Sequence, residues 1–130
     1  MTLIYLDTSV VLARLLAEDR SPPDALWSQT LVASRLLEFE VFNRLHARGA
    51  AVSHGDDARR LVDRINLVEM SAGVLGRALL PFASPVRTLD ALHLATMVYL
   101  RGQGLESALA TYDQRMAAAA LGEGFPLVEC

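Results

Sequence analysis

Short apolar runs alternate with segments of helical periodicity along this chain, and this alternation constrains the fold more than any other feature. The apolar runs predict strands, which lie at residues 2–7, 30–34, 66–70 and 107–113, with a short last strand at 126–130. The segments between them predict helices, which lie at residues 8–19, 35–49, 55–65, from Ser71 onward, 90–102 and 114–122, and residues 20–25 predict a break. Strands and helices that alternate in this way form a mostly parallel sheet with helices packed on it, so we predict an α/β fold.

The length and composition predict one domain. The chain has 130 residues, of which 52% are hydrophobic, so we expect a single domain over residues 1–130 with a sizeable core. No apolar run approaches the ~20 residues of a membrane span, and Asp7 interrupts the first run. We therefore expect no signal peptide, no membrane partner and a cytoplasmic location. Cys130 is the single cysteine, which excludes an internal disulfide framework and a multi-cysteine metal site.

The charged residues exclude several function classes. The net charge of −3 argues against general capture of a polyanion, so a nucleic-acid role requires a local cationic surface. All 12 basic residues are arginine. Without lysine the chain cannot be a P-loop nucleotide-binding protein, a receiver domain with its salt-bridging lysine, or a Schiff-base enzyme.

Three aspartates stand where predicted elements meet. Asp7 and Asp113 end predicted strands, and Asp90 begins a predicted helix. Parallel sheets place functional groups at the carboxyl ends of their strands, in the crevice where the strand order reverses, so these carboxylates could form a cluster. Aspartate is also a favoured helix N-cap, because its side chain accepts hydrogen bonds from the free amides of the first turn. The sequence leaves both interpretations open.

A fourth acidic residue lies inside a predicted helix and cannot be a cap. Glu40 has Arg44 four residues later, so a surface ion pair would explain it without any function. Helical periodicity does not separate Glu40 from Glu38, since Glu38 lies nearer the densest apolar face of the same helix. The periodicity alone leaves this choice open.

Four segments in order, "YLDTSVVL", "SRLLEFEV", "TLDALHLATM" and "ATYDQRM", resemble the PIN-domain ribonucleases. Among these the chain is most similar to the VapC-type toxins of bacterial toxin–antitoxin pairs, from Tyr5 to Met116. The resemblance implies one PIN domain over residues 1–130, built as three α/β/α layers around a mostly parallel central sheet. It also implies an acidic quartet, in which Glu40 is preferred to Glu38 by its spacing from Ser34. The quartet consists of Asp7, Glu40, Asp90 and Asp113.

The resemblance further implies that Thr8, Ser9 and Thr111 lie beside a metal site and hydrogen-bond its waters or carboxylates. Carboxylates brought close together repel one another, and a divalent cation relieves that repulsion. Oxygen ligands suit Mg²⁺ or Mn²⁺, which generate a nucleophile from water and stabilise charge during phosphodiester hydrolysis. We therefore expect a Mg²⁺-dependent endoribonuclease.

RNA binding is expected to depend on arginines near the quartet, with Arg48 as a further contact to phosphates. The main candidates are Arg14, Arg44, Arg87 and Arg115. For each of them a solvated position on a helix is an equally good explanation. His93 follows Asp90 by three residues, so both could face one site, but we expect His93 to be structural.

The resemblance implies a homodimer and a cognate VapB-type antitoxin that lies across the acidic groove. One alternative is a PIN nuclease that acts in RNA processing or DNA maintenance without an antitoxin. Another is a non-catalytic binding module whose aspartates are only caps. "YLDTSV" also suggests a haloacid-dehalogenase-like phosphatase, but that family has a second aspartate where this chain has Ser9, and generally a lysine.

Overall fold

In a computed structural model of the protein, residues 2–17 and 22–130 are described. Within them four strands form one sheet: β1 (Leu3–Leu6), β2 (Leu31–Ser34), β3 (Asn66–Val68) and β4 (Ser107–Ala110). All neighbouring strands are parallel, and their order is β3-β2-β1-β4. The predicted parallel α/β fold is confirmed. The end of the helix predicted at 8–19 and the start of the break predicted at 20–25 lie outside the described residues.

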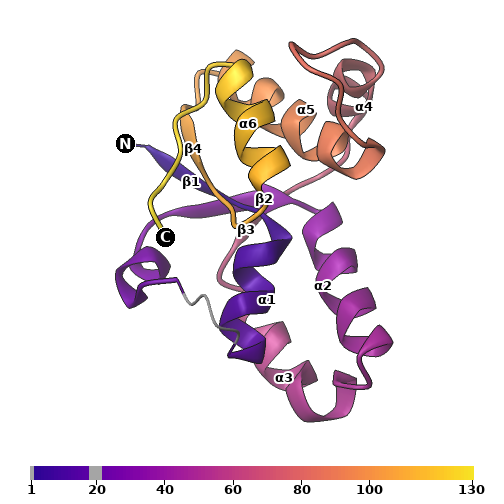
Figure 1. The fold of residues 1–130 in the computed structure, drawn as a ribbon, viewed down its shortest axis with the longest axis vertical. Coiled ribbons are helices and arrows are strands. Elements are labelled where there is room, and N and C mark those ends of the chain that lie inside the picture. Colours follow the sequence, from indigo (N-terminus) through magenta and orange to yellow (C-terminus); the bar gives the residue numbers. More distant parts are fainter. Residues whose placement is uncertain (1, 18–21) are drawn as a thin grey trace.

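Helices cover both faces of this sheet (Figure 1). On one face, α1 (Thr8–Leu16), α2 (Leu36–Ala47), α3 (Ala51–Val62) and the short 3-10 helix η1 (Asp24–Ser28) pack on the apolar side chains of the strands. On the other face, α5 (Thr88–Gly102) and α6 (Gln114–Gly122) do the same, and α4 (Ala72–Ala78) packs on α5. The result is the expected three-layer α/β/α arrangement.

The alternation of side chains along β1 explains why there are two separate cores. Ile4 and Leu6 belong to the core beneath α1, α2 and α3, whereas Tyr5 between them belongs to the core beneath α5 and α6. Successive side chains of a strand point to opposite faces of the sheet, and a strand covered on both faces reads as a continuous apolar run. The uninterrupted run "LIYL" is therefore the sequence of a central parallel strand.

The strand order reverses next to β1. The chain runs from β1 to β2 and on to β3, and then crosses to the other side of β1 to form β4. Leu6 pairs with Ala110 at the carboxyl ends of β1 and β4, and the Asp7 N–H donates to the Ala110 carbonyl at 3.0 Å. Asp7 and Thr111 thus leave the sheet side by side, at the kind of reversal point where parallel α/β folds place their ligands.

Several predicted boundaries were wrong. Helix α5 begins at Thr88, so that Asp90 lies inside its first turn, and the N-cap position belongs to Arg87. Helix α3 begins at Ala51 and not at residue 55. Strand β4 ends at Ala110, and the strand expected at 126–130 is reduced to a single bridge between Leu109 and Leu127. The described helices are all too short or too polar to cross a membrane.

Candidate active site

Asp7 occupies the N-cap position of α1, but its side chain makes no capping hydrogen bond. Its Oδ2 instead accepts hydrogen bonds from the Ser9 hydroxyl at 2.6 Å and from the Thr111 hydroxyl at 2.7 Å. These hydroxyls come from α1 and from the segment after β4, so the contact joins the two elements that flank the reversal point. Asp7 is 8% exposed. The interpretation of Asp7 as a mere helix cap was therefore wrong.

Glu40 points from α2 toward the same place. Its Oε1 accepts a hydrogen bond from the Thr8 hydroxyl at 2.9 Å and lies 2.6 Å from Nε2 of His93. The surface ion pair with Arg44 that the sequence offered as an alternative is not formed. Glu40 is thus tied by hydrogen bonds to Thr8 of α1 and His93 of α5.

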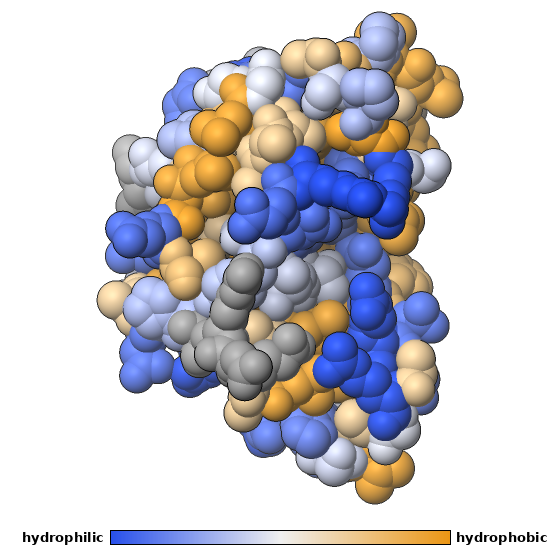
Figure 2. All heavy atoms as spheres, viewed as in Figure 1, coloured by the Kyte–Doolittle hydropathy of each residue, from blue (hydrophilic) through white to orange (hydrophobic). Residues whose placement is uncertain are grey.

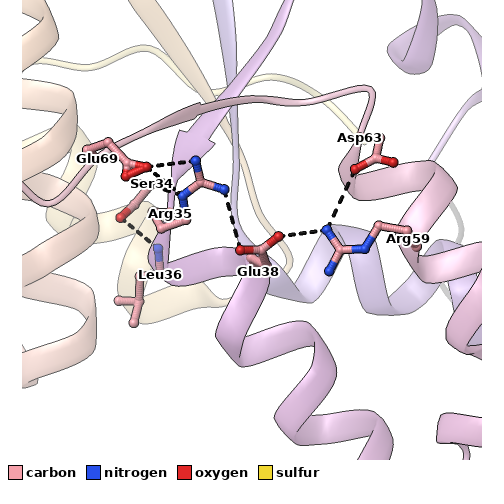
Figure 3. A network of polar contacts seen from close by, with 7 residues as sticks. All are labelled: Ser34, Arg35, Leu36, Glu38, Arg59, Asp63 and Glu69. Atoms are coloured by element: carbon pink, nitrogen blue, oxygen red, sulfur yellow. Dashed lines mark hydrogen bonds and ion pairs between the residues drawn. The ribbon is translucent and has the colours of Figure 1, made fainter.

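Glu38 lies elsewhere, in a network of ion pairs on the surface (Figure 3). Its two carboxylate oxygens lie 3.4 Å from Arg35 and 2.7 Å from Arg59, and Arg35 also pairs with Glu69. The hydrogen bond from Arg59 is the main cause of a lowered pKa for the Glu38 carboxyl. This network connects the start of α2 to α3 and to the segment after β3, so Glu38 has a structural environment that Glu40 does not share.

Asp90 faces the acidic group from the first turn of α5. Burial is the main cause of a raised pKa for its carboxyl, and the negative charges of Asp113 and Asp7 add to the effect. Among the described residues, no hydrogen bond or ion pair compensates this carboxylate. Asp90 is therefore an ionisable group in a place that disfavours its charge, which is typical of functional sites.

Asp113 is the N-cap of α6. Its Oδ1 accepts hydrogen bonds from the backbone N–H groups of Arg115 at 2.9 Å and Met116 at 3.3 Å. The interpretation as a cap is thus correct for this aspartate, although its charge also acts on Asp90. A cap uses only one carboxylate oxygen, so capping and a second role are compatible.

The four acidic residues line one cleft of about 970 Å³. Its walls also include Thr8 and Ser9, together with Arg44, Arg48 and Arg87. Figure 2 shows strongly hydrophilic side chains across the middle of this face, between the half that carries α1, α2 and α3 and the half that carries α5 and α6. Acidic and basic groups from distant parts of the sequence therefore meet at one opening.

Other residues named from the sequence lie outside the cleft lining. Thr111 stands behind Asp7 and holds it by the hydrogen bond already described. Arg14 pairs with Asp24 at 2.9 Å and lies over the ring of Trp27, and the exposed Arg115 follows Asp113 on the outside of α6. The structure thus brings Arg44 and Arg87 to the acidic group and leaves Arg14 and Arg115 apart from it.

Sequence reasoning missed three polar residues of the lining, namely Asn43, Thr88 and Tyr112. Asn43 lies on α2, one turn after Glu40, and its spacing of three residues from Glu40 was the available signal. Thr88, the first residue of α5, and Tyr112 also line the cleft, and the backbone N–H of Tyr112 donates to the Ser9 hydroxyl at 3.0 Å.

The donor chemistry of the cleft fits a hard divalent cation that keeps much of its water. Within residues 2–17 and 22–130, no three His, Cys, Asp or Glu side chains stand close enough together to hold a metal ion. Mg²⁺, however, is usually held by only one or two carboxylates and retains several waters. In Asp7, Glu40 and Asp113 the side-chain hydrogen bonds to described residues all fall on one carboxylate oxygen, so the second oxygen of each is available to a ligand.

Comparison with known proteins identifies the fold family. The sequence model of the PIN domain family matches residues 4–121 of this chain. The chain belongs to the PIN domain family. It is 35% identical over 133 residues to ribonuclease VapC46 of Mycobacterium tuberculosis, with 98% of each chain covered. It is 27% identical over 130 residues to ribonuclease VapC47 of the same species, with 95% of this chain and 93% of the relative covered.

A solved structure described as a toxin–antitoxin complex from Klebsiella pneumoniae shares this PIN fold, with a TM-score of 0.65 and 20% identity. The two structures match over 99% of this chain and 97% of the Klebsiella pneumoniae chain. The resemblance of this PIN domain to the VapC-type proteins is thereby confirmed by sequence, and its fold by structure.

Proposed function

We propose that this PIN domain is a Mg²⁺-dependent endoribonuclease and the toxin of a VapBC-type pair, restrained by a cognate VapB-type antitoxin. The observation that carries the proposal is the meeting of Asp7, Glu40, Asp90 and Asp113 in one cleft at the reversal point of the sheet. The names of the relatives, both ribonucleases of the VapC type, support the choice of RNA as substrate.

Carboxylates of this quartet, one or two directly and the others through water that the ion retains, would hold Mg²⁺ or Mn²⁺, which when bound supplies a Lewis acid and an activated water for phosphodiester hydrolysis. The residues of the chain orient these groups. Ser9 and Thr111 fix one oxygen of Asp7, Thr8 and His93 fix one oxygen of Glu40, and the start of α6 fixes one oxygen of Asp113. Each carboxylate then presents its second oxygen in a defined direction, which lowers the reorganisation needed when substrate arrives.

Arg44 and Arg87 would hold the RNA backbone beside the acidic centre. They line the cleft from α2 and from the position before α5. Guanidinium groups bind phosphate in a bidentate manner, so two of them can orient the strand although the net charge of the protein is −3. Thr8 and Ser9, at the start of α1, are close enough to the carboxylates to contact the scissile phosphate as well.

The antitoxin and the dimer are proposed on different grounds. The structural neighbour is described as a toxin–antitoxin complex, and an antitoxin segment laid across the cleft would block substrate access. Exposed leucines on α4, after it and at the start of α5, namely Leu75, Leu79, Leu80 and Leu89, form an apolar surface of the kind that a second subunit covers. A cytoplasmic location would follow from an RNA substrate.

The deciding experiment is cleavage of a mixture of structured RNAs by the purified protein. Cutting is expected with Mg²⁺ or Mn²⁺ and not with EDTA. Asp90→Asn, prepared in parallel, should not cut, which excludes a contaminating nuclease. Equal cutting by both proteins would refute the proposed site. If the wild type neither cuts nor binds a divalent ion, the acidic residues have only a structural role.

A further inference from the structure

Two buried polar residues stand behind Glu40, outside the cleft. His93 on α5 is 1% exposed and Tyr5 on β1 is 0% exposed. The Tyr5 hydroxyl lies 2.8 Å from Nδ1 of His93, and Nε2 of His93 lies 2.6 Å from Oε1 of Glu40. At the other end, the backbone N–H of Ser34 donates to the Tyr5 oxygen at 3.1 Å. A continuous chain of hydrogen bonds therefore runs from the end of β2 to a carboxylate of the candidate site.

The direction of these hydrogen bonds follows from the carboxylate at one end. The carboxylate oxygen Oε1 of Glu40 accepts, so Nε2 of His93 carries a proton and donates it. A neutral imidazole with its proton on Nε2 accepts at Nδ1, so the Tyr5 hydroxyl donates to Nδ1 while its oxygen accepts from the Ser34 amide. Each polar group in this series of hydrogen bonds then has a partner, as burial requires.

These hydrogen bonds restrain the carboxylate group of Glu40, which is the group that would bind a ligand. A glutamate on a helix has several rotatable bonds, and holding it in one rotamer costs conformational entropy. His93 and Thr8 both bind Oε1, which leaves Oε2 for the cleft. Ser9 and Thr111 restrain Asp7 in the same manner, but their hydroxyls lie beside the cleft, whereas His93 is buried.

We propose that Tyr5 and His93 are positioning residues that fix the orientation of the Glu40 carboxylate in the acidic cleft. This inference rests on the proposed function, because it gives Glu40 a role as a metal-holding group. It assigns to a buried histidine and tyrosine an effect on metal affinity, although neither side chain reaches the cleft.

Two amide variants of His93 test the proposal as a matched pair. In His93→Gln the side chain is long enough to keep an N–H donor near Oε1 of Glu40. In His93→Asn the side chain is shorter by one methylene group and reaches only toward Tyr5. Partners that orient a metal ligand typically contribute 10- to 100-fold in affinity. We therefore expect His93→Asn to weaken Mn²⁺ binding by about tenfold or more, and His93→Gln to remain within about threefold of the wild type.

Calorimetric titration with Mn²⁺ measures these affinities on protein without substrate, and thermal denaturation with EDTA reports the stability of each variant. The two measurements separate positioning from folding, because both amides disturb the core while only one loses the donor to Glu40. Tyr5→Phe, which removes only the hydroxyl, should lower Mn²⁺ affinity in the same direction by a smaller factor, and it replaces the pair if neither amide variant folds.

The decisive comparison repeats His93→Asn in a Glu40→Gln background. If His93 acts through Glu40, the second substitution causes no further loss of Mn²⁺ affinity. Equal losses in both backgrounds, or equal affinities of His93→Gln and His93→Asn, would overturn the inference. Different results would refute the proposed function itself. Either the wild type would bind no Mn²⁺, or Glu40→Gln would bind Mn²⁺ as tightly as the wild type does.

Discussion

The environment of Asp90 predicts that a substitution which abolishes activity also stabilises the metal-free protein. The Asp90 carboxyl has a raised pKa because of burial and the charges of Asp113 and Asp7. An acid whose pKa is higher in the folded state than in the unfolded state favours folding when protonated. That contribution is lost as the pH rises from the ordinary value of 3.8 through the folded pKa. At neutral pH the ionised Asp90 therefore opposes folding.

Asp90→Asn removes the charge and keeps the shape. Two effects compete, because Asp90 lies in the first turn of α5, where a negative charge gains about 0.3–1 kcal/mol from the helix dipole. We expect burial and the charges of Asp113 and Asp7, which raise the pKa of the Asp90 carboxyl, to outweigh this gain. No hydrogen bond to a described residue is lost either. We expect a net stabilisation of about 1 kcal/mol at pH 7, which is about 4 °C in melting temperature for a chain of this size.

Thermal denaturation with EDTA, followed by circular dichroism, measures this difference. It should shrink as the pH approaches the ordinary range of an aspartate, because the wild-type carboxyl then becomes protonated. Mn²⁺ at about 100 times its dissociation constant should stabilise the wild type by about 2.7 kcal/mol and the variant by much less. A variant that melts below the wild type at pH 7 in EDTA would refute the electrostatic argument, and an equal Mn²⁺ effect on both proteins would refute Asp90 as a ligand.

Two further pairs of variants test the site. Glu40→Gln should lower RNA cleavage at least ~100-fold, which is about 2.7 kcal/mol of transition-state stabilisation. Glu38→Gln should leave the rate within about twofold and lower stability by no more than about 1 kcal/mol, since its partners Arg35 and Arg59 are 36% and 48% exposed and solvent screens the ion pairs. Equal losses of cleavage would mean that the wrong glutamate has been assigned. Removing Arg44 and Arg87 together should reduce the dependence of log affinity for single-stranded RNA on log salt by about 1.4, because each phosphate contact contributes about 0.7. Arg14→Ala, which removes an arginine held by Asp24, should leave that slope unchanged, and a similar change in both proteins would place RNA outside the cleft.

The order of strands and helices could be predicted because it depends on local patterns. The apolar run before Asp7 and the helical spacing after it predicted β1 and α1 correctly. Boundaries were less accurate where a polar residue had two possible roles. Asp90 was taken as the first residue of α5 because aspartate favours helix starts, but the helix begins at Thr88 and Asp90 lies in its first turn.

The side chains of the site could be predicted only in part, because their orientation depends on distant partners. No local rule predicts that Asp7 prefers the hydroxyl of Thr111 to the amides of its own helix, since these residues are 104 positions apart. Helical periodicity could not separate Glu38 from Glu40 for the same reason. Arg35 and Arg59 hold Glu38 beside α3 and the segment after β3, whereas Thr8 and His93 hold Glu40 in the acidic cleft, although both side chains are 21% exposed.

Asp90 differs from the other three carboxylates, because hydrogen bonds orient those three and none to a described residue orients Asp90. Asp7, Glu40 and Asp113 each have one oxygen fixed by hydroxyl, imidazole or amide donors, so their directions are set before any ligand arrives. Asp90 has no such donor among the described residues, and its charge is opposed by the charges of the other three. A bound divalent cation would relieve this charge repulsion, and Asp90 would contribute more to the free energy of cation binding than any of the other three carboxylates. The residue least stabilised by the fold is therefore the one on which binding of a divalent ion should depend most.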